Sequence, residues 1–270
     1  TAIVIDGLTA WLEGLERDDQ ARAKAAIDRA LAWLENWSRG TAGQIDPFNA
    51  PYALSTLIRY QRREAAAQTV RRIVETQRED GNWSVYGPAR PASFNTAQCV
   101  MALAEAQSAK VEVPKGTFQR GILALQSMRQ TGGLFPYSTA AGHDWMTTDH
   151  GSISRDPLCE NALFAAGRGD ESSLEAALRR FLQHYEELRL PTKKLYDYFN
   201  SRGHGGYFFF YALRNAKEAA RHAKPDLRAQ VLSRVRTAAL AAREGDGSFM
   251  DHHMIGRAYS TAMALYILAD

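Results

Sequence analysis

The sequence predicts an all-α fold in which five to six helical hairpins close into an α/α toroid, with an inner ring of helices inside an outer ring. Two observations predict it. Segments that are apolar almost all round alternate with amphipathic segments, and the pair recurs roughly every 50 residues, a spacing typical of helical arrays. A helix without a polar face has to be buried, whereas a helix with a charged face borders solvent. No segment sustains the period-two alternation of a β-strand.

Six apolar segments are expected to form the inner ring. They begin near Thr1, Phe48, Asn95, Pro157, Gly206 and Tyr259. Asp46, Asn95 and Asp156 precede or open three of these segments, and such side chains are common N-caps, with proline at the first helical position after Asp46 and Asp156.

Five amphipathic segments are expected to form the outer ring. They begin near Gln20, Glu64, Lys115, Glu171 and Leu227, and Gly40, Gly81, Gly133 and Gly247 supply helix stops. The spacing of Ile27, Leu31 and Leu34 illustrates their single apolar stripe. The first apolar segment has no amphipathic segment before it. We therefore expect residues 1–270 to form one toroid domain that lacks one outer helix at its N-terminus.

Composition excludes several classes of protein. The chain has 270 residues, of which 45% are hydrophobic, so a large core can form. Its 33 basic and 30 acidic residues are scattered along the helical segments, which argues against a nucleic-acid partner. No apolar run approaches the roughly 20 residues of a membrane span. Cys99 and Cys159 lie in apolar segments and are expected to be buried thiols, which leaves the cellular compartment undetermined.

A short motif recurs where an amphipathic segment ends. It reads Gln77, Asp80, Gly81 and Trp83 in its fullest form. Weaker copies place Gln126, Gly133 and Phe135, then Arg243, Asp246, Gly247 and Phe249, in the same order. The glutamine is suited to bond the backbone at a helix end, and the aromatic ring is suited to pack on the neighbouring hairpin.

This motif resembles the QW repeat of the squalene-hopene cyclases and the related repeat of protein prenyltransferase β subunits. The resemblance implies the toroid fold and a central cavity for an isoprenoid or another hydrophobic ligand. The catalytic strings of these families do not occur here: there is no Asp-rich acid motif, and Ser260 stands where the prenyltransferases have a zinc-binding histidine. We therefore expect neither a metal nor another cofactor.

The starts of inner helices converge at one mouth of a toroid, so polar residues there are site candidates. The candidate catalytic residues are Arg155, Asp156, Glu160, His204, His252 and Tyr259; further candidates at this mouth are Asp46, Asn49, Tyr52, Ser93, Asn95, Gln98, Tyr207 and His253. Each has a structural alternative. Asp156 can cap its helix, Glu160 can pair with Arg155 rather than act as a general acid, and His252 can be an exposed loop residue.

Two other groups of residues point to specific ligands. The segment 139–154 carries His143, Asp144, Trp145, Asp149 and His150, which could bind metal with His253 only if they converge. Aromatic residues are dense between Tyr196 and Tyr211, where they either pack in the core or line a cavity for an isoprenoid chain or carbocation.

Three functions remain open. The first is binding or conversion of an isoprenoid or other hydrophobic ligand, as the resemblance implies. The second is a carbohydrate-active enzyme that uses paired carboxylates such as Asp46, Asp156 or Glu160. The third is a non-catalytic scaffold that binds a protein partner through an exposed apolar patch. A deep apolar cavity would favour the first, and converging acids the second.

Overall fold

The computed structural model describes residues 1–40, 48–84, 91–139, 152–189, 209–251 and 255–269, and within them every regular element is helical. Their β-type contacts are three isolated bridges, Ser84 with Pro91, Ala92 with Ser138 and Arg243 with Phe249. The predicted all-α class is therefore confirmed.

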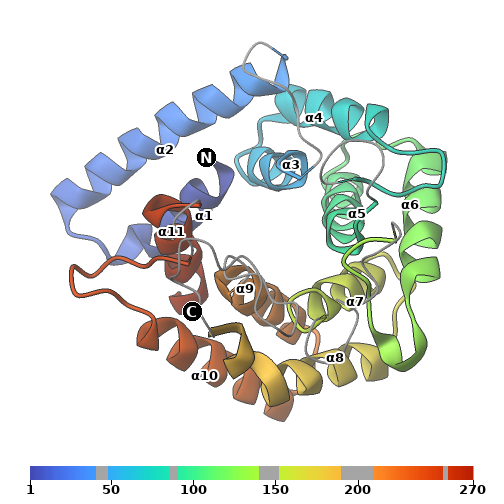
Figure 1. Ribbon diagram of the computed structural model, residues 1–270. Coiled ribbons are helices and arrows are strands. Elements are labelled where there is room, and N and C mark those ends of the chain that lie inside the picture. Colours follow the sequence, from blue (N-terminus) through green and yellow to red (C-terminus); the bar gives the residue numbers. More distant parts are fainter. Residues whose placement is uncertain (41–47, 85–90, 140–151, 190–208, 252–254, 270) are drawn as a thin grey trace.

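The helices form two concentric rings (Figure 1). The inner ring comprises α1 (Ala2–Trp11), α3 (Ala50–Arg59), α5 (Ser93–Ser108), α7 (Asp156–Ala165), α9 (Phe209–Ala220) and α11 (Arg257–Leu268). The outer ring comprises α2 (Arg17–Ser38), α4 (Arg63–Glu75), α6 (Lys115–Met128), α8 (Glu171–His184) and α10 (Pro225–Ala241). Short 3-10 helices span η1 (Leu12–Gly14), η2 (Thr131–Gly133) and η4 (Tyr185–Arg189). The predicted alternation of inner and outer helices is confirmed, and because each outer helix runs back, the inner helices share one direction.

Burial separates the two rings as the hydrophobic patterns predict. Almost every residue of α9 is buried, from Phe209 to Ala220, because this helix packs on neighbours on nearly all sides. By contrast, α2 buries one stripe that includes Ile27, Leu31 and Leu34, and its other face carries charges. Cys99 and Cys159 are buried free thiols on α5 and α7, as expected.

The Gln77–Trp83 motif joins neighbouring hairpins. Gln77 Nε2 donates to the carbonyls of Gly81 (3.0 Å) and Thr117 (2.9 Å), and its Oε1 accepts from Arg120 (2.8 Å). The buried Trp83 donates its indole N–H to the carbonyl of Ile73 at 2.8 Å. The motif therefore ties the end of α4 to α6, which is the role expected from the residues.

The backbone N–H of each motif aromatic is held by a side chain at the start of the next inner helix. Trp83 donates to Thr96 Oγ1 at 3.1 Å. Phe135 donates to Asp156 Oδ1 at 3.0 Å, and Phe249 to Thr261 Oγ1 at 3.1 Å. Three repeats thus share this backbone-to-side-chain hydrogen bond, with threonine as the acceptor in two of them and aspartate in the third.

Two of the predicted helix N-caps, Asn95 and Asp156, are wrong. The N-cap positions of α5 and α7 are Ala92 and Arg155, and neither has a side-chain capping bond. Asn95 instead donates to the carbonyl of Ser84 at 2.9 Å, and Asp156 binds Phe135. Both side chains satisfy the adjacent turn rather than their own helix. Asp46 lies outside the described residues.

The ring is closed by close contact between its first and last helices. In Figure 1, α1 lies directly beside α11. A Cβ atom at Gly7 would lie 2.6 Å from the carbonyl oxygen of Ala262 and 2.8 Å from its Cα. The absence of a side chain at Gly7 therefore permits the two backbones to approach this closely.

Candidate functional site

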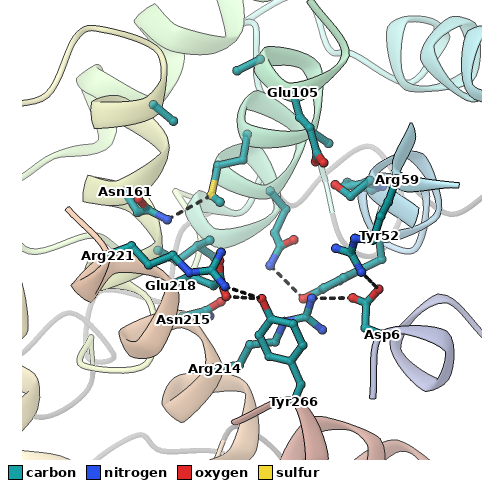
Figure 2. A pocket seen from close by; sticks show the side chains of 18 of the residues that line it. Asp6, Tyr52, Arg59, Glu105, Asn161, Arg214, Asn215, Glu218, Arg221 and Tyr266 are labelled. Atoms are coloured by element: carbon teal, nitrogen blue, oxygen red, sulfur yellow. Dashed lines mark hydrogen bonds and ion pairs between the residues drawn. The ribbon is translucent and has the colours of Figure 1, made fainter. Parts of the chain in front are cut away.

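The inner ring encloses a central cavity of about 370 Å³ (Figure 2). All six inner helices contribute to its wall. The polar lining residues are Asp6, Tyr52, Ser55, Arg59, Gln98, Glu105, Ser108, Asn161, Arg214, Asn215, Glu218, Arg221 and Tyr266. The apolar ones are Pro51, Met101, Ala102, Ala104, Leu158 and Ala165. Most residues that line the cavity thus carry charged or hydrogen-bonding groups.

Exposure of the lining residues shows where the cavity opens. Tyr52 and Leu158, near the starts of α3 and α7, are buried. Arg59, Ser108 and Arg221, at the ends of α3, α5 and α9, are exposed. The cavity therefore opens toward the C-terminal ends of the inner helices, opposite the mouth where the sequence placed the site.

Asp6 on α1 connects three helices across the cavity wall. Its Oδ1 accepts from Arg59 Nη1 at 2.6 Å, and its Oδ2 from Arg214 Nη2 at 2.7 Å. Thr56 Oγ1 donates to Oδ1 at 3.4 Å. Because the carboxylate is buried, these charged partners offset the cost of removing it from water.

Two tyrosine rings flank Arg214. The guanidinium lies 4.4 Å from the ring centroid of Tyr266 and 5.5 Å from that of Tyr52, and both are cation–π contacts. Burial raises the pKa of both phenols to about 12, so they stay protonated. Gln98 Nε2 donates to the Tyr52 hydroxyl at 2.8 Å.

The cavity also contains two glutamates in different surroundings. Burial raises the pKa of Glu105, as do the charges of Asp6 and Glu218, against the opposing effects of Ser55 and Arg59. The Glu218 carboxylate forms an ion pair with Arg221 at 2.7 Å and accepts from the Tyr266 hydroxyl. The same cavity therefore contains one acid that is biased toward its neutral form and another that is held by a cation.

The predicted residues Arg155, Asp156 and Glu160 do not line this cavity. Asp156 Oδ2 accepts from Ser152 Oγ (2.8 Å), which precedes α7, and from Arg180 Nε (3.3 Å) on α8. Arg155 donates to the carbonyl of Phe135 at 3.2 Å. These contacts lie between α7 and its neighbours, so Arg155 and Asp156 stabilise the packing of the inner ring against the outer ring.

The expected pairing of Glu160 with Arg155 is wrong. Glu160 pairs with Arg129, whose Nε lies 2.8 Å from Oε1, because Glu160 projects toward the end of α6. Beyond this ion pair, neither carboxylate oxygen has a hydrogen-bond partner among the described residues. Burial raises the pKa of Glu160 to about 7 and that of Asp156 to about 6 despite the nearby arginines.

Tyr259 is partly buried near the start of α11, and its pKa is raised by burial and by interaction with Tyr52 and Asp251. Of the other mouth candidates, Tyr52 and Gln98 line the cavity, Asn49 borders a second pocket at α1–α3, and Ser93 donates to the Pro136 carbonyl. In the aromatic group, Phe209, Phe210 and Tyr211 are core residues. His143, Asp144, Trp145, Asp149, His150, Tyr196, Tyr198, Phe199, His204, Tyr207, Phe208, His252 and His253 lie outside the described residues.

Sequence reasoning missed Asp6, Glu105, Arg214 and Glu218. A signal was present: Asp6 is the only charged residue between Thr1 and Ala10, in a segment otherwise suited to burial. Charged residues inside inner helices need partners, and the ring supplies those partners across its centre. The described residues contain no group of three or more histidine, cysteine or acidic side chains arranged to hold a metal ion.

The described helices, closed into a double ring around a polar cavity, define an α/α toroid. No family model matches the chain, and no curated protein matches it. Within the described part of the chain, no helix combines the length and hydrophobicity of a membrane span.

Solved structures with this fold include the α-1,6-mannanase GH76A of Salegentibacter sp. HEL1_6, with a TM-score of 0.66, 12% identity and coverage of 99% of this chain and 88% of that one. An inactive variant of that enzyme, with two consecutive aspartates replaced by asparagine, was solved with α-1,6-mannotriose and scores 0.65 at 13% identity, with the same coverage. The type II terpene cyclase MstE of Scytonema scores 0.54 at 13% identity and covers 99% of this chain and 87% of its own. Such identities show a shared fold alone.

Proposed function

We propose that this toroid is a carbohydrate-active protein that binds an oligosaccharide in its central cavity and cleaves a glycosidic bond there. The polar lining of the cavity carries the proposal. A sugar offers hydroxyl groups on all sides, and the wall offers carboxylates, guanidinium groups, amides and phenols to bind them. The volume of about 370 Å³ lies within the range of roughly 300–1,000 Å³ typical of small-molecule sites.

The two glutamates supply the chemistry in this proposal. Glu105, with its raised pKa, donates a proton to the oxygen of the leaving group. Glu218, held by Arg221, provides the negative charge that stabilises the oxocarbenium-like transition state or activates water. The division of roles follows the general rule that one neutral and one ionised acid are required.

The fold comparison supports a carbohydrate ligand but not a transfer of catalytic residues. The only two consecutive aspartates of this chain are Asp18 and Asp19. They lie in the first turn of the outer helix α2, and both are exposed. A hydrolase built on this chain would therefore use other acids than the neighbouring mannanase.

Glu105→Gln tests the mechanism. Loss of the proton donor should lower the rate of hydrolysis of α-1,6-mannotriose or other hexose oligosaccharides by about 100-fold or more, because general acids contribute on that order. Product release from a panel of oligosaccharides, followed by chromatography, measures it. Asp18→Asn is the control and should leave the rate unchanged. An unaffected Glu105→Gln enzyme would contradict the assigned role.

A second candidate is an isoprenoid or other hydrophobic ligand. Phe48, Tyr52, Phe94 and Tyr137 form a chain of ring contacts near the starts of α3 and α5, with centroids 5.0 to 6.3 Å apart. The shared fold of the terpene cyclase adds to this observation. Binding of farnesol or geranylgeraniol, with no binding of the oligosaccharide panel, would favour this function. Binding of neither class would favour the scaffold.

A further inference from the structure

Two buried amide side chains face the central cavity from adjacent inner helices. Asn161 on α7 is 4% exposed and Asn215 on α9 is 5% exposed. Asn161 Oδ1 and Asn215 Nδ2 have no hydrogen-bond partner among the described residues. The remaining amide nitrogen of Asn161 lies 3.9 Å from Met101 Sδ, which is a weak acceptor.

Such groups destabilise a protein unless something binds them. An unpartnered buried donor or acceptor costs about as much as a lost hydrogen bond, and buried polar atoms are normally satisfied. The other polar groups of the cavity are paired differently: Asp6 binds Arg59 and Arg214, and Glu218 binds Arg221 and Tyr266. The two amides are therefore the groups of this wall with free capacity for a ligand.

The two amides lie on one side of the cavity. In Figure 2, Asn161 and Asn215 lie across the cavity from Asp6 and Tyr52, and Asn215 is next to Glu218. One amide offers an acceptor and the other a donor. Exchanging the oxygen and nitrogen of both amides together also leaves one acceptor and one donor.

Resting on the proposed function, we propose that Asn161 and Asn215 determine specificity by binding two neighbouring hydroxyl groups of one uncharged sugar ring. One hydroxyl donates to Asn161 Oδ1, and the next accepts from Asn215 Nδ2. A vicinal diol matches this pair, because each hydroxyl both donates and accepts. The sugar ring then rests against the wall formed by α7 and α9, within reach of Glu218.

The test compares Asn161→Leu and Asn215→Leu with the parent protein. Binding of α-1,6-mannotriose and a panel of other hexose trisaccharides is measured by calorimetry, and unfolding is followed thermally. Each leucine is expected to weaken binding by about 10- to 100-fold, because one good hydrogen bond to the sugar is lost. The melting temperature should stay the same or rise, since an unpaired buried amide is replaced by an apolar side chain of similar size.

Asn36→Leu, on the exposed face of α2, is the matched control and should not change affinity. Analogues that lack one ring hydroxyl complete a double-mutant cycle. The parent should discriminate against one such analogue about 10-fold or more, and the matching leucine variant should lose that discrimination.

The outcomes separate the two proposals. If the parent binds no saccharide of the panel, the proposed function is overturned, and this inference with it. If the parent binds but both leucine variants bind equally well, only the role of the amides is overturned. A fall in melting temperature without loss of hydroxyl discrimination assigns the amides a purely structural role and also overturns it.

Discussion

Asp156 and Glu160 lie four residues apart on α7, and both carboxyl groups are almost fully buried. Each has an arginine from outside the inner ring as its partner, Arg180 for Asp156 and Arg129 for Glu160. The two acids face the layer between the rings, so their ionisation affects how α7 holds its neighbours rather than the central cavity.

Because the pKa of Glu160 is about 7 in the folded protein and 4.5 without burial, the native state binds more protons than the unfolded state between these values. Stability from this group is therefore full below pH 4.5 and is lost as the pH rises through 7. We expect the free energy of unfolding to fall by about 1–2 kcal/mol over this window, less than the full shift implies, because the pair with Arg129 is partly exposed.

Glu160→Gln should flatten this pH dependence, as measured by urea unfolding at pH 5 and pH 8. It should also retain hydrolysis, since Glu160 is outside the cavity. Loss of activity with unchanged stability would instead assign Glu160 the catalytic role that the sequence suggested.

At the level of single residues, the sequence predicted which charged side chains are buried better than it predicted their ion-pair partners. Glu160 was recognisable as a buried acid because it lies one turn into an apolar segment. Its partner, Arg129, is 31 positions earlier and comes close only after the hairpin of α6 and α7 folds. The cavity acids were missed for a similar reason, since Asp6 meets Arg214 only when the ring closes.

At the level of elements, the Gln77–Trp83 motif joins consecutive hairpins. Trp83 packs against Gly121 of α6, where an added Cβ would lie 2.8 Å from the indole ring. The same residue binds the end of α4 and the start of α5. The backbone and side chain of this one residue therefore connect α4, α5 and α6.

Trp83→Phe should lower the free energy of unfolding by about 1–3 kcal/mol, because it removes the hydrogen bond to Ile73 and leaves unfilled volume in the core. Urea unfolding measures the change. Trp33→Phe, at a half-exposed position on α2, is the control and should change stability by less than about 0.5 kcal/mol. Equal effects at the two positions would contradict the role of the motif.

The elements themselves were predictable because helix class depends on local periodicity. Their boundaries agree within a few residues where Pro157 and the glycine turns punctuate the chain. The caps were not predictable, since Asn95 and Asp156 bind the preceding turn through contacts that sequence spacing does not reveal.

At the level of the whole molecule, the seam between α1 and α11 closes the ring. Gly7→Ala should destabilise the protein by about 1–3 kcal/mol, because the added methyl group meets the backbone of Ala262, which cannot move aside cheaply. Thermal unfolding and limited proteolysis measure it. Gly14→Ala, where no atom lies within 4 Å of the added Cβ, is the control. A Gly7→Ala protein as stable as the parent would show that the contact between α1 and α11 accommodates the added methyl group.

The common direction of the inner helices has an electrostatic consequence at the cavity entrance. Each helix carries a partial negative charge at its C-terminus, and the ring gathers these ends around one opening. Lys217 neutralises the carbonyls at the end of α11, and Arg59 and Arg221 lie at the ends of α3 and α9. Basic side chains thus lie at the C-terminal ends of α3, α9 and α11 on this rim. An uncharged sugar would pass the rim at a rate insensitive to ionic strength, whereas the passage of a uronate would depend on it.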